Sequence, residues 1–182
     1  MKVAVYFATG YEEIEALSVV DVLRRAQVDV TMVGVTGKTV VSGRGISLNM
    51  DQLIEEVNHD EIDMIILPGG VPGVDNLKAN EKLVNLLKQF KEEGKWLGAI
   101  CAAPSILGEL SLLKGEKATC YPGYEDKLLG AHFTGERTVV SGKTITGKGA
   151  GASLEFALTI LEIIKGKEVA EKIATGMIVA DK

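Results

Sequence analysis

Apolar residues along this chain gather in short continuous runs that alternate with amphipathic segments. Continuous runs rich in β-branched residues predict strands that are buried on both faces of a sheet. The predicted strands are residues 2–8, 28–35, 64–70 and 95–100, with shorter ones at 117–122 and within 137–147. Residues 39–49 predict a hairpin that turns at Gly43–Gly45.

Apolar positions at helical spacing separate these runs and predict five helices. They cover residues 14–26, 80–94, 103–113, 152–164 and 167–175. Strands that alternate with helices are typical of an α/β fold with a mostly parallel sheet and helices on both faces. No linker, repeat or low-complexity segment interrupts the pattern, so residues 1–182 are expected to form a single domain.

Composition excludes several classes of function. The formal net charge is −5, with no basic face of the kind that follows a phosphate backbone, so nucleic acid is not expected as the main partner. No run approaches the roughly 20 apolar residues of a membrane helix, and the apolar start is too brief for a signal peptide. Two cysteines are too few for a disulfide framework, which indicates a reducing, cytoplasmic location.

In open parallel sheets, ligand sites form at the carboxyl ends of strands. One such end carries Ala99-Ile100-Cys101-Ala102-Ala103, which follows the small-x-nucleophile-x-small pattern of a strand-to-helix elbow. Pro104 suits the first turn of the helix that follows, and the positive end of that helix is expected to lower the pKa of Cys101. The alternative is that Cys101 is a small buried apolar residue, but the elbow and the strand end together favour a nucleophile.

A reactive thiol usually has a histidine partner, and the sequence offers no obvious one. His59 lies in a polar stretch that is typical of a solvated loop, and His132 is expected in a strand near a turn. The better partner is Glu15, which lies among apolar residues on the expected inner side of the first helix. Next to a thiolate its carboxyl group would retain a proton and could donate it in a hydrogen bond. Glu12 and Glu13 have ordinary capping roles at that helix start.

Two glycine-rich segments could also bind an anion. The backbone N–H groups of Gly69 and Gly70 can form an oxyanion hole, although a tight turn explains them better when they are taken alone. Residues 147–153 resemble a phosphate-binding loop but lack its Gly-Lys-Ser/Thr ending, so close helix packing explains them better.

Taken together, GYEEIEA, VDVLRRA, LPGG, AICAAPSIL, AHFT and GASLEFALTILEIIKGKEVA resemble the ThiJ/PfpI superfamily, in the branch of the parkinsonism-associated protein DJ-1 and its bacterial relatives. These segments extend over essentially the whole chain. The resemblance implies a flavodoxin-like three-layer fold and a homodimer. It also implies that Cys101 is an easily oxidised nucleophile and Glu15 its protonated partner.

The resemblance assigns further residues. It places Gly69, Gly70 and the Ala102 N–H around the oxyanion position, and Arg25 and Arg44 near the dimer interface. Two departures matter. Ala102 follows the cysteine where the protease-like branches have histidine, so a peptidase is not expected. Tyr121 stands where DJ-1 has a histidine near the cysteine, and a phenol of pKa about 10 is a poor base. The neighbouring Cys120 is expected to pack rather than to react.

Two functions remain open at this stage. The first is a cysteine-dependent enzyme without metal or cofactor that acts on small dicarbonyls, as a glyoxalase or a protein deglycase. The second is a non-enzymatic, redox-sensing stress or chaperone-like protein whose Cys101 is oxidised. Flavin binding follows from the fold alone and has no supporting aromatic pair or phosphate loop.

Overall fold

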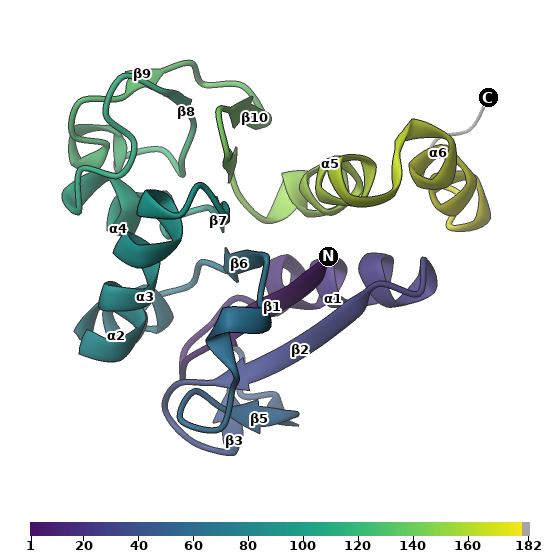
Figure 1. Ribbon diagram of the computed structural model, residues 1–182, viewed down its shortest axis with the longest axis horizontal. Helices are drawn as coiled ribbons and strands as arrows, with labels where there is room; N and C mark the ends of the chain where they lie inside the picture. The colour runs from purple at the N-terminus through teal and green to yellow at the C-terminus, as the bar shows by residue number, and fades with distance from the viewer. Residues whose placement is uncertain (180–182) are drawn as a thin grey trace.

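Seven strands form the central sheet of the computed structural model, which describes residues 1–179 (Figure 1). Their order is β10-β11-β7-β6-β1-β2-β5, and every neighbouring pair is parallel except β10 and β11. The strands are β1 (Lys2–Phe7), β2 (Asp29–Gly34), β5 (Gln52–Leu53), β6 (Met64–Leu67), β7 (Trp96–Ile100), β10 (Thr138–Ser141) and β11 (Thr144–Gly147).

Helices cover both faces, so the predicted flavodoxin-like α/β architecture is confirmed. On one side of the sheet in Figure 1 lie α2 (Gly73–Ala79), α3 (Glu81–Glu92) and α4 (Pro104–Glu109). On the other lie α1 (Glu13–Arg25), α5 (Ser153–Lys165) and α6 (Lys167–Gly176). Residues 180–182 of the predicted domain lie outside the described residues.

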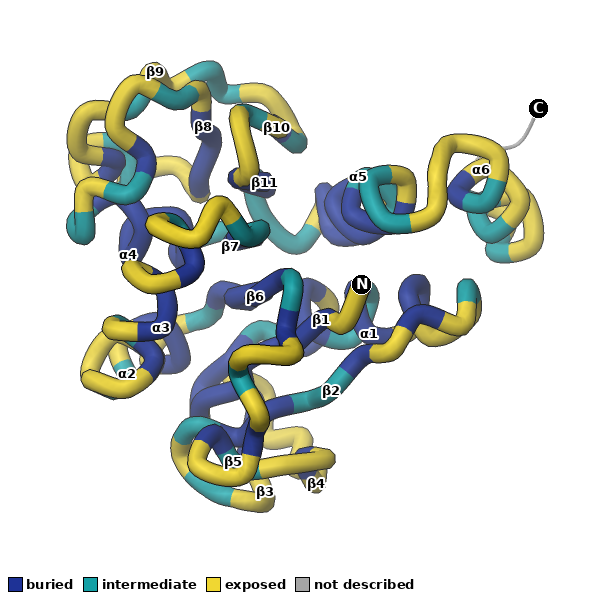
Figure 2. The backbone as a smooth tube through the Cα atoms, viewed as in Figure 1, coloured by how far each residue is buried: buried dark blue, intermediate teal, exposed yellow. Residues whose placement is uncertain are grey.

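Successive side chains of β1 point to opposite faces of the sheet, so they pack into two separate hydrophobic cores, one under each layer of helices. Ala4 and Tyr6 pack on the side of α2, α3 and α4. Val5 and Phe7 pack on the side of α1 and α5. Figure 2 shows these central strands buried over most of their length. A strand buried on both faces has no polar side, which is why the sequence shows continuous apolar runs.

The predicted hairpin is confirmed as β3 (Thr39–Val41) and β4 (Ser47–Asn49), an antiparallel pair outside the main sheet that is largely exposed in Figure 2. The pair β8 (Lys117–Ala118) and β9 (His132–Phe133) forms another small sheet. Three 3₁₀ turns complete the described structure: η1 (His59–Glu61), η2 (Glu125–Lys127) and η3 (Ala150–Ala152).

Two predicted elements are shorter in the structure. The strand expected over 117–122 ends at Ala118, because the Thr119 N–H donates to Thr146 Oγ1 at 2.9 Å and the chain leaves the strand path. The helix expected over 103–113 ends at Glu109, and Ser111 takes a left-handed φ of 59°. α2 and β5 were not predicted, since they are short and carry little periodic signal.

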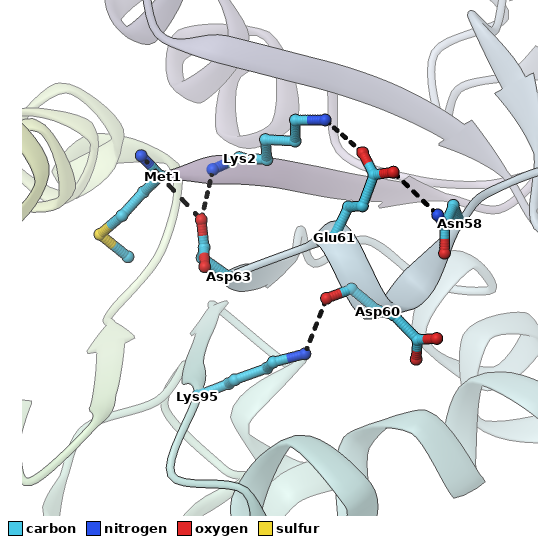
Figure 3. Close-up of polar contacts among 7 residues, drawn as sticks. All are labelled: Met1, Lys2, Asn58, Asp60, Glu61, Asp63 and Lys95. Carbon is cyan, nitrogen blue, oxygen red and sulfur yellow. Dashed lines mark hydrogen bonds and ion pairs between the residues drawn. The ribbon is translucent and has the colours of Figure 1, made fainter.

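Charged residues tie the amino ends of β1 and β6 together (Figure 3). The Asp63 carboxylate accepts the backbone N–H of Lys2 at 2.7 Å, and the Lys2 ammonium pairs with Glu61. Asn58 also donates to Glu61, at 2.9 Å. This cluster lies at the amino ends of the strands, whereas ligand sites in such sheets form at the carboxyl ends. It therefore stabilises the sheet and takes no part in the candidate site. Within residues 1–179, no helix combines the length and the apolar character that crossing a membrane requires.

Candidate active site

Cys101 lies on a sharp turn between β7 and α4, as the elbow pattern predicts. Its φ is +65°, a left-handed value that costs a non-glycine residue on the order of 1–2 kcal/mol. The backbone holds the residue there from both sides. The Cys101 N–H donates to Gly147 O at 2.9 Å, and its carbonyl accepts the Tyr121 N–H at 2.8 Å. The strand ends of β7 and β11 therefore fix the strained turn that presents the sulfur.

Small residues surround the sulfur and bring backbone N–H groups to it. The N–H groups of Ala102 and Gly70 both interact with the Cys101 sulfur and favour its anionic form. Pro104 begins α4, where its missing N–H costs no helical hydrogen bond. A negative charge on the sulfur, or on an oxygen bonded next to it, is thus met by backbone donors from two loops.

Glu15 reaches the same place from α1. It is only 1% exposed, and its Oε2 accepts the Gly69 N–H at 2.8 Å. Oε1 has no hydrogen-bond partner in residues 1–179. Burial raises the pKa of this carboxyl group to about 7, against smaller lowering effects of the Cys101 thiol and the Gly69 N–H. A carboxyl group with a free oxygen and a pKa near neutrality can hold a proton and give it to a neighbour.

The Cys101 thiol and the Glu15 carboxyl group titrate as a pair. Burial, and then the negative charge of Glu15, raise the pKa of Cys101 to about 12. That value belongs to a thiol facing an ionised carboxylate, which makes it the second ionisation of the pair. The first proton leaves near pH 7. The proton that remains can lie on either group, since the Gly69 N–H stabilises a Glu15 carboxylate and the Ala102 and Gly70 N–H groups stabilise a Cys101 thiolate.

The expectation that the following helix lowers the pKa of Cys101 is therefore corrected. α4 has only six residues, and the net effect on the thiol is an increase caused by burial and by Glu15. What favours the thiolate is local: the Ala102 and Gly70 N–H groups, and a protonated Glu15.

The two glycines of the 69–70 pair have different roles. A Cβ on Gly69 would lie 2.6 Å from Glu15 Oε2 and 2.6 Å from Cys101 Cβ, so no side chain fits there. Its N–H is engaged by Glu15, which corrects its assignment to the oxyanion position. Gly70 has a φ of +92° and supplies an N–H to the sulfur, so the oxyanion position is left to Gly70 and Ala102.

Neither histidine joins the site. His59 is not the solvated loop residue that the sequence indicated: its ring is half-buried and lies 3.1 Å from the Tyr6 hydroxyl and 3.0 Å from the Ile54 carbonyl oxygen. That position is near the amino end of β6, away from the elbow. His132 is an exposed residue of β9, as predicted.

Tyr121 lies beside the elbow, with its side chain 50% exposed and its backbone N–H bonded to Cys101 O. Its ring stands 3.3 Å from where a Cβ on Gly149 would be. Cys120 is fully buried in the core on the α2–α4 side, and burial raises the pKa of its thiol to about 11. Cys120 therefore packs, as the sequence indicated.

The remaining residues singled out in the sequence lie around this centre. Arg25 is on the exposed side of α1, where it pairs with Asp21 at 2.7 Å. Arg44 is at the tip of the β3–β4 hairpin and lines a small cavity of about 150 Å³ next to Gly70. Glu12 caps α1 by accepting the Glu15 N–H at 2.8 Å, which confirms its capping role.

Glu13 has a role that the sequence did not reveal. Its Oε1 accepts the Ser42 hydroxyl at 2.6 Å and the Arg44 N–H at 3.0 Å, which anchors the hairpin next to the site. A buried acceptor with partners about thirty residues away in sequence leaves no local pattern to detect. Among residues 1–179, no cluster of three or more His, Cys, Asp or Glu side chains could hold a metal ion.

A half-buried cysteine on a strand-to-helix elbow lies with a buried carboxyl group and N–H donors from two loops at the carboxyl ends of a parallel sheet, which defines a cysteine-centred α/β protein. Residues 1–163 match the model of the DJ-1/PfpI family, and the chain belongs to that family. A similar curated protein is Protein DJ-1 homolog B of Arabidopsis thaliana, 41% identical over 169 residues. The match covers 92% of this chain but 39% of that relative, so the chain spans about two fifths of its length.

Two further proteins are informative. The glutathione-independent glyoxalase DJR-1.2 of Caenorhabditis elegans is 35% identical over 159 residues, covering 86% of this chain and 84% of that one. The solved structure of oxidized DJ-1 from Toxoplasma gondii aligns with a TM-score of 0.93 at 38% identity, covering 97% of each chain. The family therefore includes a protein named as a glyoxalase and one whose structure was solved in an oxidised form.

Proposed function

We propose that this protein is a cysteine-dependent enzyme that converts small 2-oxoaldehydes into 2-hydroxy acids, as a glutathione-independent glyoxalase does. The observation that carries the proposal is the pairing of Cys101, held at a positive φ on its elbow, with a Glu15 whose pKa burial raises to about 7. The first residue supplies a nucleophile, and the second supplies a group that can accept and return a proton at neutral pH.

The geometry fits each step of such a reaction. The Cys101 thiolate adds to the aldehyde carbon of methylglyoxal, and the oxygen that becomes anionic meets the Gly70 and Ala102 N–H groups. Glu15 first gives its proton to that oxygen and then, as a carboxylate, removes the proton from the same carbon and returns it to the neighbouring ketone carbon. The hydroxyl proton passes to the former ketone oxygen, which leaves a thioester of lactate. Water then releases lactate and restores the thiol. One water is added in total, and the oxidation of one carbon balances the reduction of the other.

Production of lactate from methylglyoxal tests this proposal. Cys101→Ser is expected to abolish turnover, and Glu15→Gln to lower kcat about 100-fold or more, in the range of general acid–base catalysis. Matched controls are Cys120→Ala for the thiol and Glu12→Gln for the carboxyl group, since neither touches the reacting atoms. Full activity in Cys101→Ser would refute the proposal. Hydrolysis of glycated protein, a related deglycase activity, is tested with the same variants.

The alternative function is non-enzymatic redox sensing. A half-buried thiol next to two N–H donors and a carboxyl group with an unpartnered oxygen also favours a stable sulfinate. If this is the main function, peroxide adds two oxygen atoms to Cys101 and changes the thermal stability, and the purified protein does not turn over methylglyoxal.

The protein is also proposed to form a homodimer near Arg25 and Arg44. Light scattering on the native protein and on an Arg25→Glu variant would test this proposal.

A further inference from the structure

A second cavity lies between the segment at Tyr121 and Pro122 and the turn that follows β11. It has a volume of about 280 Å³ and is lined by Tyr121, Pro122, Arg137, Lys148 and the glycine-rich segment 149–152. Backbone contacts connect it to the nucleophile, since Tyr121 binds the Cys101 carbonyl and Gly147, just before Lys148, accepts the Cys101 N–H. Two of its walls are therefore bonded to the backbone of the elbow, although Cys101 itself does not line the cavity.

The lining of this cavity is mostly apolar, and the charged residues that contribute to it are basic. Arg137 and Lys148 both contribute, and none of its lining residues has a carboxyl group. Arg137 is partly neutralised, because its Nε bonds Glu155 at 2.8 Å and its Nη2 bonds the Gly151 carbonyl. Lys148 differs: Nζ donates only to Gly135 O, at 3.1 Å, and has no acidic partner within 4.0 Å among residues 1–179. A half-buried ammonium group without a counter-ion can pair with an anionic group of a ligand.

The neighbouring side chains suit an anionic group on a short chain. The Tyr121 ring packs against Gly149, and a Cβ at position 149 would lie 3.3 Å from the ring. The phenol is half-exposed at this opening and can donate a hydrogen bond to an oxygen. The glycine-rich segment, which the sequence left as close packing, thus forms one wall of the cavity.

We propose that this cavity is an anion subsite of the Cys101 site and that Lys148 is its main determinant, so the preferred substrates are 2-oxoaldehydes that carry a carboxylate or phosphate group. This inference rests on the proposed function for its substrate class. The proposal that an anion binds here does not depend on turnover, because it is argued from the cavity and from the basic residues that line it. The chemistry is unchanged: 4,5-dioxopentanoate plus one water gives 2-hydroxyglutarate, with the aldehyde carbon oxidised and the ketone carbon reduced.

Alkylation of Cys101 tests the subsite without any need for turnover. Iodoacetate is anionic and iodoacetamide is its neutral counterpart, so the ratio of their rate constants at Cys101, followed by mass spectrometry, reports the local attraction for an anion. Lys148→Gln is expected to lower this ratio about three- to fivefold, the size of a partly screened charge interaction. Lys148→Arg keeps the charge and is expected to keep the ratio.

Lys143 provides a matched control at the other end of β11. It is exposed, and its ammonium group lies 4.6 Å from the centre of the Trp96 ring. Lys143→Gln removes the same charge from the opposite flank of β11. It is expected to leave the ratio of the iodoacetate and iodoacetamide rate constants unchanged. An equal ratio in the wild type and Lys148→Gln, or an equal loss in Lys143→Gln, would overturn the subsite.

Turnover then tests the substrate class. In the wild type, kcat/KM for 4,5-dioxopentanoate is expected to exceed that for its neutral methyl ester, and Lys148→Gln is expected to remove this preference. Methylglyoxal turnover without any preference for the acid over the ester would overturn the proposed substrate class and leave the proposed function standing. A ratio that falls in Lys148→Gln with no turnover of any dicarbonyl would support the subsite and refute the proposed function.

Discussion

Gly69 and Cys101 approach so closely that a methyl group on the glycine would lie 2.6 Å from the cysteine Cβ and 3.1 Å from its sulfur. The same methyl group would lie 2.6 Å from Glu15 Oε2. Only a residue without a side chain lets the nucleophile and its carboxyl partner share this space. Gly69 therefore controls the distance between the Cys101 thiol and the Glu15 carboxyl group, although Gly69 itself does not react.

Gly69→Ala is expected to destroy dicarbonyl turnover, because it pushes the two reactive groups apart, and to cost about 1–3 kcal/mol of unfolding free energy through overpacking. Turnover and urea unfolding measure the two effects. Gly176→Ala is the matched control, since a Cβ there meets nothing within 4 Å. Normal turnover in a folded Gly69→Ala would show that the close approach is not required.

Glu15 makes the stability of the protein depend on pH. Its pKa is 4.5 when unperturbed and about 7 when folded, so the folded state holds more protons than the unfolded state between these values. The free energy of unfolding then falls as pH rises through this window, by about 3 kcal/mol in total. Below pH 4.5 the carboxyl group is neutral in both states, and this penalty is absent.

Glu15→Gln has no such titration. Urea unfolding at pH 4.5 and pH 8 is expected to show that this variant gains stability relative to the wild type by about 3 kcal/mol between the two pH values. Glu12→Gln, which removes the carboxyl group that caps the same helix, serves as the comparison variant. A constant difference between Glu15→Gln and the wild type would mean that Glu15 ionises as freely when folded as when unfolded.

Tyr121 is expected to orient the substrate rather than to transfer a proton from carbon. Tyr121→Phe removes only the hydroxyl group and leaves the backbone hydrogen bond to Cys101, so kcat with methylglyoxal should fall less than about 10-fold. Steady-state kinetics over pH 6 to 9 would measure this effect. A loss as large as that of Glu15→Gln would instead make the phenol a catalytic group.

The fold could be predicted because its signals are local. Continuous apolar runs such as the one around Val5 occur where both faces of a strand are buried, and turns with glycine follow them. Cys101 was visible for the same reason, since its small neighbours and Pro104 lie beside it in the sequence. Glu15 was visible because a carboxyl group among apolar residues stands out on a helix.

Other features depend on contacts between distant segments. The Gly69 N–H is engaged by a residue 54 positions away, which no local pattern shows. Glu13 anchors a hairpin 29 residues on, at Ser42, and the His59 ring turns inward to Tyr6 across 53 positions. The sequence also did not show that burial and an ionised Glu15 raise the pKa of Cys101, because the helix end was visible there and the amount of burial was not.

The central claim is that Cys101 and Glu15 share a proton and form a nucleophile near neutral pH. The most direct test is the rate of iodoacetamide alkylation at Cys101 from pH 5 to 10, in the wild type and in Glu15→Gln. The wild-type rate is expected to rise with a half-point near pH 7 and then level off, because the pair loses one proton in this range and the thiolate is present whenever Glu15 holds the proton that remains. In Glu15→Gln the half-point should move upward, toward or beyond the unperturbed value of about 8.5. A wild-type rate that still rises tenfold per pH unit above pH 9 would contradict the claim, since the thiol would then keep its proton and Glu15 would carry the charge.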